Sequence, residues 1–127
     1  MQDEERIFKV QADFCGVMCH AKRVQIMSIL KDGEKTVSDL AAALEISVPN
    51  VSQHLRVMRD QGAVVTRKGG QQVFYSVAHP NFIEACRLIR EGLSELLQQR
   101  SRAFAGNEAG EASPKTPLSP AGEGNRT

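Results

Sequence analysis

Apolar residues recur at helical spacing in the first part of the chain, and this pattern predicts two helices. From Gln2 to Met18 an apolar residue returns every three to four positions, as one face of a helix requires. A second helix is predicted from about Ala21 to Lys31, where Asp32 and Gly33 end the pattern. The apolar stripe of the first helix consists of Ile7, Val10, Phe14, Val17 and Met18.

Two shorter helices, only a few residues apart, are predicted next. The segment from Thr36 to Leu44 begins with a capping box, in which Thr36 and Asp39 satisfy each other's backbone N–H groups. In the segment from Ser47 to Arg59, Ser47 is a good N-cap, and Pro49 suits a first turn whose amides lack partners. The apolar side of this fourth helix carries Val48, Val51, Leu55 and Met58.

The other side of this fourth helix is suited to approach phosphates. It carries Asn50, Gln53 and Arg56, and it has no carboxylate before Asp60. Two short consecutive helices, of which the second has a polar outer face without carboxylates, are typical of a helix-turn-helix.

Residues 62–77 predict a β-hairpin. Gly62 ends the preceding helix, and the segments VVT and QQVFYSV that follow are rich in β-branched and aromatic residues. Gly69 and Gly70 supply the positive-φ positions of a two-residue turn. With Arg67 and Lys68 at its tip, the hairpin is predicted to be a wing that reaches phosphates or a neighbouring minor groove. The alternative is a small helical domain with an incidental hairpin.

A last helix is predicted from His79-Pro80-Asn81 to about Arg100, and a disordered tail after it. Residues 102–127 are rich in Gly and Pro with one leucine, so they bury too little apolar area to offset the entropy of ordering. We therefore expect one domain over residues 1–101 and a disordered tail over residues 102–127. The stripe of the last helix consists of Phe82, Ala85, Cys86, Ile89, Leu93, Leu96 and Leu97.

The fold class expected from these elements is mainly α with a small β-hairpin, a winged helix-turn-helix. The segments HAKRVQIMSIL, TVSDLAAAL, SVPNVSQHLRVMR and RKGGQQVFYSV, in this order and spacing, resemble the ArsR/SmtB winged-helix repressors. The resemblance covers roughly Phe14 to Leu97. It implies a dimer that pairs through the first and last helices, places the fourth helix in the DNA major groove and leaves DNA when an inducer binds.

Composition agrees with a small binding module. At 127 residues there is room for one domain, and the net charge of +1 does not by itself indicate a nucleic-acid binder. Local charge is the better guide. Between residues 50 and 70 the charged residues are Arg56, Arg59, Asp60, Arg67 and Lys68, a basic excess.

The sequence also argues against several classes of protein. It has no apolar run of about 18 residues and no signal-peptide pattern, so neither a membrane span nor secretion is expected. Three cysteines, an odd number, fit a reducing cytoplasm better than a disulfide framework. An enzyme is not expected, because no Ser/His/Asp, paired-carboxylate or phosphate-loop arrangement is visible.

The expected partner is double-stranded DNA, bound by a homodimer. The first and last helices carry longer apolar stripes than a helix-turn-helix core requires, and such surplus usually marks a protein interface. A two-fold dimer presents two recognition helices about one DNA turn apart, which predicts a palindromic operator. The residues expected to read bases are Pro49, Asn50, Ser52 and Gln53. The inclusion of Ser52 follows from the resemblance to the family. The residues expected to bind phosphates are Arg56, Arg67 and Lys68.

The cysteines are the candidates for inducer chemistry. Cys15 and Cys19 are one helical turn apart at the end of the first helix, and Cys86 lies in the last helix. In the family these two helices are neighbours across the dimer. Three thiolates suit arsenite or another soft metal as ligand, whereas two suit oxidation to a disulfide or a persulfide-derived bridge. No other cofactor is expected.

The family's known sensor sites are only loosely matched. The cysteine pair of many arsenite and cadmium sensors is absent from Thr36 to Leu40, and the last-helix zinc site is absent because His79 has no second histidine downstream. Pairing Cys19 with Cys86 is similar in kind to the family's sulfide and redox sensors. Two functions therefore remain open: a repressor released by a thiol-reactive signal, or a winged-helix DNA-binding or interaction module with purely structural cysteines.

Overall fold

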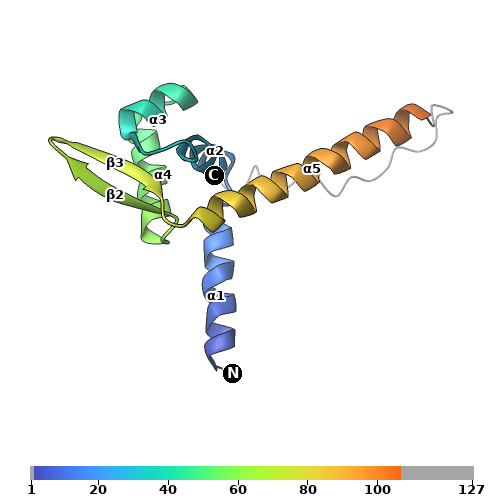
Figure 1. The fold of residues 1–127 in the computed structure, drawn as a ribbon, viewed down its shortest axis with the longest axis horizontal. Coiled ribbons are helices and arrows are strands. Elements are labelled where there is room, and N and C mark those ends of the chain that lie inside the picture. The colour runs from blue at the N-terminus through green and yellow to red at the C-terminus, as the bar shows by residue number, and fades with distance from the viewer. Residues whose placement is uncertain (1, 107–127) are drawn as a thin grey trace.

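The computed structural model describes residues 2–106, and within them the chain forms five α-helices and three β-strands (Figure 1). In chain order these are α1 (Gln2–Val17), α2 (Ala21–Leu30), β1 (Lys35–Thr36), α3 (Val37–Leu44), α4 (Val48–Asp60), β2 (Val64–Gly69), β3 (Gln72–Val77) and α5 (Pro80–Gly106). The expected winged helix-turn-helix is confirmed. No helix in this part of the chain is long and apolar enough to cross a membrane.

The hydrophobic core lies where α2, α3, α4 and the start of β2 meet. Its largest fully buried side chains are Ile26, Met27, Leu40, Val51, Leu55, Met58 and Val64. Burying one such side chain contributes about 1.5–3 kcal/mol, so the apolar face of α4 holds this helix firmly in one orientation. Phe14 of α1 and Phe82 of α5 pack against the core with their ring centroids 4.6 Å apart. The end of α1 and the start of α5 are thereby fixed to the body of the domain.

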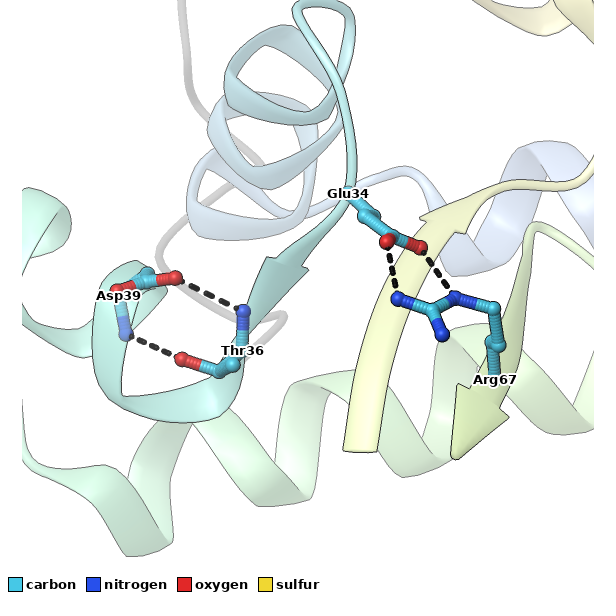
Figure 2. A network of polar contacts seen from close by, with 4 residues as sticks. All are labelled: Glu34, Thr36, Asp39 and Arg67. Carbon is cyan, nitrogen blue, oxygen red and sulfur yellow. Dashed lines mark hydrogen bonds and ion pairs between the residues drawn. The ribbon is translucent and has the colours of Figure 1, made fainter. Parts of the chain in front are cut away.

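Both helices of the helix-turn-helix begin at the caps that the sequence predicts. The Thr36 Oγ1 accepts a hydrogen bond from the Asp39 N–H, and the Asp39 carboxylate accepts one from the Thr36 N–H, each at 3.1 Å (Figure 2). At the start of α4, the Ser47 Oγ accepts a hydrogen bond from the Asn50 N–H at 3.2 Å. Such caps are worth about 1 kcal/mol each.

The wing is a sheet whose strands, within residues 2–106, follow the order β1-β3-β2, with both pairings antiparallel. The hairpin of β2 and β3 is confirmed, whereas β1 was not expected from the sequence. Lys35 pairs with Tyr75 and Thr36 with Phe74, so the segment just before α3 is attached to the wing. The helix-turn-helix and the wing therefore form one rigid unit.

The turn of the wing differs from the prediction. Gly69 pairs with Gln72 as the last position of the ladder, so the two-residue turn is Gly70-Gln71 and not Gly69-Gly70. Gly70 has the required positive φ of 67°. At Gly69 a Cβ would lie 2.9 Å from the Phe74 Cε2, so this glycine is needed for close packing and not for its backbone angle.

The apolar face of α4 also differs at one position, because Val48 is 45% exposed while His54 is buried. At 3.6 residues per turn, these two residues lie about 60° to either side of Val51. The His20 and Arg23 side chains lie against the His54 ring, whereas the core residues do not include Val48. Tertiary packing, and not apolar character, therefore decides which flank of the helix is covered.

Helices α1 and α5 project away from the rest of the domain (Figure 1). Helix α5 continues to Gly106, past the end expected at about Arg100, so residues 102–106 are helical and the disorder expected there is wrong. The segment RSRAFA has neither Gly nor Pro to stop the helix before Gly106. The remainder of the expected tail, residues 107–127, lies outside the described residues.

Candidate nucleic-acid interface

The outward face of α4 is polar and free of carboxylates through its first two turns. Val51, Leu55 and Met58 anchor the opposite face in the core. The side chains expected to contact DNA from this helix are all exposed, namely Pro49, Asn50, Ser52, Gln53 and Arg56. A rigid helix with exposed amide and hydroxyl groups at its N-terminal end is the arrangement with which helix-turn-helix proteins read base edges.

The wing carries Arg67 and Lys68, both exposed, but their charges differ in availability. Arg67 forms two hydrogen bonds with the Glu34 carboxylate, Nε to Oε1 at 3.1 Å and Nη2 to Oε2 at 2.5 Å (Figure 2). The same guanidinium lies over the Phe74 ring, 4.7 Å from its centroid. Lys68 is in no ion pair among the described residues. Lys68 is therefore the wing cation more available to a phosphate.

The ion pair shifts the titration of both partners. Hydrogen bonding to Arg67 lowers the pKa of the Glu34 carboxyl, and hydrogen bonding to Glu34 raises the pKa of Arg67. Both groups therefore stay charged at neutral pH, and the net charge of the pair is zero.

A basic hollow lies beside the exposed polar face of α4, between this helix and the start of α2. It is lined by His20, Lys22 and Arg23 of the α2 end, and by Asn50, Gln53 and His54 of α4, together with Ile46. The Arg23 Nε donates a hydrogen bond to the His54 Nδ1 at 3.1 Å, and its Nη1 donates one to the Val17 carbonyl at 3.1 Å. His54 is 8% exposed, and burial lowers its pKa, with the nearby charges of His20, Arg23 and Lys22 acting in the same direction. The ring is therefore neutral at pH 7.

Long apolar faces on α1 and α5 are uncovered in the single chain. Their large side chains range from 39% to 68% exposed. They are Ile7, Phe8 and Val10 on α1, and Leu88, Ile89, Leu93, Leu96, Leu97 and Phe104 on α5. Large apolar side chains exposed in this number on two helices have the character of a protein interface.

The cysteines lie in two different environments. Cys15 and Cys19 are exposed, and the Cys19 thiol donates a hydrogen bond to the Cys15 carbonyl at 3.4 Å. Cys86 is half-buried in a hollow of about 60 Å³ that is also lined by Met27 of α2 and by Lys31, the C-cap of this helix. Burial raises the pKa of the Cys86 thiol, and Arg90 opposes the rise. Within residues 2–106 no three His, Cys, Asp or Glu side chains gather closely enough to hold a metal ion.

Two features of this surface were missed in the sequence. Glu34 neutralises one of the expected phosphate contacts, and Arg23 donates a hydrogen bond to the buried His54. In each pair the residues are more than 30 positions apart, so helical periodicity gives no sign of them. The absence of any carboxylate near His20, Lys22 and Arg23 in the sequence was the available signal.

An exposed polar recognition helix beside a basic wing defines a winged helix-turn-helix DNA-binding protein. Residues 20–65, which contain α2, α3 and α4, match the family described as "Bacterial regulatory protein, arsR family". The structure of reduced HlyU from Vibrio cholerae N16961 is 32% identical with a TM-score of 0.63, over 72% of this chain and 96% of HlyU. The chain therefore belongs to the ArsR family of transcriptional regulators and is not an enzyme.

Two further relatives extend the comparison. The HTH-type transcriptional regulator Rv0081 of Mycobacterium tuberculosis (strain H37Rv) is 28% identical over 109 residues, 85% of this chain and 96% of Rv0081. Its crystal structure matches with a TM-score of 0.68 and 29% identity, over 75% of this chain and 96% of that chain. The homodimeric winged helix-turn-helix domain of Mb0332 from Mycobacterium bovis has a TM-score of 0.72 at 21% identity, over 78% of this chain and 92% of that chain. At this identity the match shows a shared fold only.

Proposed function

We propose that the protein is a homodimeric transcriptional repressor of the bacterial cytoplasm, released from its operator by a thiol-reactive signal. The observation that carries the DNA-binding part is the outward face of α4, exposed and without carboxylates, beside a basic wing. Repression needs no further machinery, because a bound dimer covers DNA that the transcription apparatus must reach.

The exposed side chains divide into two groups by the chemistry of their contacts. Pro49, Asn50, Ser52 and Gln53 lie on the first two turns of α4, where side chains can meet base edges in the major groove. The cations are assigned to phosphates, which position the protein and carry no sequence information. They are Arg56, Arg67 and Lys68.

Dimerisation is proposed through the apolar faces of α1 and α5. These faces are exposed in the single chain, and Mb0332, which shares the fold, is a homodimer. A two-fold axis through these helices presents two copies of α4 to the same side of the DNA. The operator is then a palindrome with half-sites about 10 base pairs apart.

The sensing step is proposed to involve Cys86 with Cys19, Cys15 or both. In bridging, two thiols form one S–S bond, and a peroxide that takes up their two electrons and two protons becomes two waters. A persulfide achieves the same result in two steps. Its outer sulfur is transferred to the first protein thiol, and the thiol that carried it is released. The second protein thiol then attacks the inner sulfur of the new persulfide, which forms the S–S bond and releases H₂S. In arsenite binding, three S–As bonds replace three As–OH bonds and release three waters.

The cysteine environments support a division of labour in bridging. The raised pKa of the half-buried Cys86 reduces its thiolate fraction, which makes it the poorer attacking group. The exposed Cys15 and Cys19 are accessible to a reagent from solvent. We favour bridging over arsenite, because a two-sulfur site requires less of the geometry than three converging thiolates.

A bridge between α1 and α5 would change how the two protomers sit relative to each other. Since both recognition helices must match half-sites one turn apart, a small rotation is enough to lose affinity. The required coupling is about 1–3 kcal/mol, which is typical of allosteric switches.

The experiment begins with selection of binding sites from a random duplex pool by the purified, reduced protein. We expect a palindromic consensus, and a single half-site would contradict the dimeric mode of binding. Release is then measured with peroxide, a persulfide or arsenite, while lost thiols are counted. Two lost thiols indicate a bridge, and three lost per bound arsenic indicate arsenite.

The Cys86→Ser variant separates the sensor from a structural role. It is expected to bind the selected operator as tightly as the native protein but to remain bound when the reagent is added. Cys15→Ser and Cys19→Ser, tested singly, identify the second thiol. Normal release by Cys86→Ser would instead favour a DNA-binding module with structural cysteines, a role that the partial burial of Cys86 also suits.

A further inference from the structure

The basic hollow between α2 and α4 has a composition that the readout of bases does not explain. It is an open hollow of about 460 Å³. Four of its lining side chains are cationic or can become so, namely His20, Lys22, Arg23 and His54, and no carboxylate lines it. Among the described residues, neither Lys22 nor Arg23 is in an ion pair.

The positive charge of Arg23 is held without an anion. Its two hydrogen bonds go to neutral acceptors, the His54 Nδ1 and the Val17 carbonyl, each at 3.1 Å. Partial burial lowers the pKa of this guanidinium, which reflects the cost of keeping the charge there. A partly desolvated cation is stabilised strongly by an oxyanion, so the hollow favours an anionic occupant.

The imidazoles add donors and an unused polar atom. Since the His54 Nδ1 accepts from Arg23, the proton of the neutral ring resides on Nε2, which is a donor. The His20 ring meets His54 edge-on with centroids 4.6 Å apart, and its Nδ1 is buried with no hydrogen-bond partner among the described residues. Lys22, Arg23 and His54 line the same hollow, and each carries N–H donors of the kind that bind the oxygens of a tetrahedral oxyanion.

The position of the hollow indicates where the oxyanion comes from. Asn50 and Gln53 line the hollow and also belong to the proposed base-reading face of α4. The phosphates of a DNA strand border the major groove, so a helix seated in the groove brings a phosphate to its flank. No residue of the wing strands β2 and β3 lines the hollow, and the wing holds its own cations, Arg67 and Lys68.

We propose that this hollow is a phosphate site, occupied in the complex by a backbone phosphate at the edge of each half-site. The proposal rests on the proposed function, because it needs α4 to lie in the major groove. Lys22 supplies a charge that no ion pair compensates within residues 2–106, and Arg23 with His54 supplies further N–H donors. Free phosphate and phosphorylated small molecules share this chemistry, and the experiment distinguishes them from DNA.

The test compares Lys22→Gln with Lys31→Gln, which removes a lysine charge at the C-cap of α2, where Lys31 is paired with Asp32. Affinity is measured as a function of salt for the selected operator and for an unrelated duplex. For Lys22→Gln we expect about fivefold weaker binding to both duplexes near 0.15 M salt, and a slope of log K against log salt that is smaller by about 0.9. Lys31→Gln is expected to match the native protein.

A second variant and a second probe complete the design. His54→Gln keeps a side-chain amide in place of the ring and is expected to weaken both duplexes as well, without changing the preferred sequence. Inorganic phosphate is titrated into the DNA-free protein against chloride of equal ionic strength, with the histidine ring resonances as readout. Saturating shifts of His20 and His54, lost in Lys22→Gln, would assign the site to free phosphate as well as DNA. Shifts that appear only with duplex would assign it to DNA alone.

Failure of this inference differs from failure of the proposed function. If the native protein binds no duplex, the proposed function is wrong. If the native protein binds its operator and Lys22→Gln keeps the same affinity and salt slope as Lys31→Gln, the phosphate site is wrong while DNA binding stands.

Discussion

Arg67 on β2 and Glu34, in the loop before β1, are joined by two hydrogen bonds across 33 positions of sequence. The pair bridges the two outer parts of the wing sheet, because β1 and β2 lie on opposite sides of β3. It also neutralises one of the cations that a DNA-binding wing is expected to present. In the proposed DNA complex, Glu34 would therefore compete with a phosphate for Arg67.

Removing this competitor is expected to strengthen DNA binding. In Glu34→Gln the Arg67 charge is no longer compensated, so we expect higher affinity for all duplexes. The slope of log K against log salt should become steeper by about 0.9. Fluorescence titration at several salt concentrations measures both quantities. Glu84→Gln is the matched control, because Glu84 forms a similar two-point pair with Arg87 on α5, away from α4. Weaker binding by Glu34→Gln would mean that the carboxylate positions Arg67 for DNA.

Base reading and phosphate binding are expected to separate in two alanine variants. Gln53→Ala should cost about 1–3 kcal/mol on the selected operator and relax the preference at one base pair. Lys68→Ala should weaken operator and unrelated duplexes by the same factor and reduce the salt slope. Both side chains are exposed, so neither change should alter the melting temperature. Unchanged operator affinity in Gln53→Ala, and also in Arg56→Ala, would remove α4 as the recognition helix.

The sequence predicted those parts of the fold that depend on local chemistry. Thr36 with Asp39, and Ser47 with the Asn50 amide, cap α3 and α4 through residues three positions apart, so the pattern is legible in the chain. The short strand β1 could not be predicted in this way. Lys35 and Thr36 show no alternation of apolar and polar residues, and they form a strand only because they pair with β3.

The candidate site was predicted only in part for the same reason. Exposure of Gln53 follows from helical periodicity, but burial of His54 and exposure of Val48 depend on which neighbour covers each flank of α4. The neighbours are Arg23 and His20, which come from a different helix and from the residue before it. Long-range ion pairs such as that of Glu34 are equally invisible to periodicity.

The two adjacent glycines of the wing are expected to respond differently to alanine. In Gly70→Ala the new side chain occupies a residue with a φ of +67°, at a cost of about 1–2 kcal/mol. In Gly69→Ala the backbone is unstrained, but the Cβ would lie 2.9 Å from the Phe74 Cε2 and 3.2 Å from the Arg67 Nη1, so the contact between these two side chains must change. Gly16→Ala in α1, with nothing within 4 Å, should stabilise by about 0.5–1 kcal/mol. Urea unfolding measures all three, and a neutral Gly70→Ala would contradict the turn assignment.

Stability is expected to fall as the solution becomes acidic because of His54. Burial lowers the pKa of the folded ring below the ordinary value of 6.5, so in this range the unfolded chain binds more protons than the folded one. The free energy of unfolding therefore decreases as the pH falls through 6.5 towards the lower pKa of the folded state. Urea unfolding at intervals between about pH 7.5 and 5 should show a shallower decline for His54→Gln than for the native protein. Carboxylate titrations are common to both proteins, so equal slopes would show that the ring is not the source.

A charge placed on the exposed face of α5 is expected to dissociate the dimer without unfolding the protomer. Leu97 is 55% exposed in the single chain, so Leu97→Glu costs the monomer little. Burying one such leucine is worth about 1.5–3 kcal/mol, and a two-fold interface contains the change twice. The dissociation constant of the dimer should therefore rise by at least about a hundredfold. Gln98→Glu adds the same charge at the next exposed position and should leave the dimer intact. Sedimentation equilibrium measures the association, and circular dichroism verifies the helices. A Leu97→Glu protein that remains dimeric, with its fold preserved, would place the interface elsewhere than on α5.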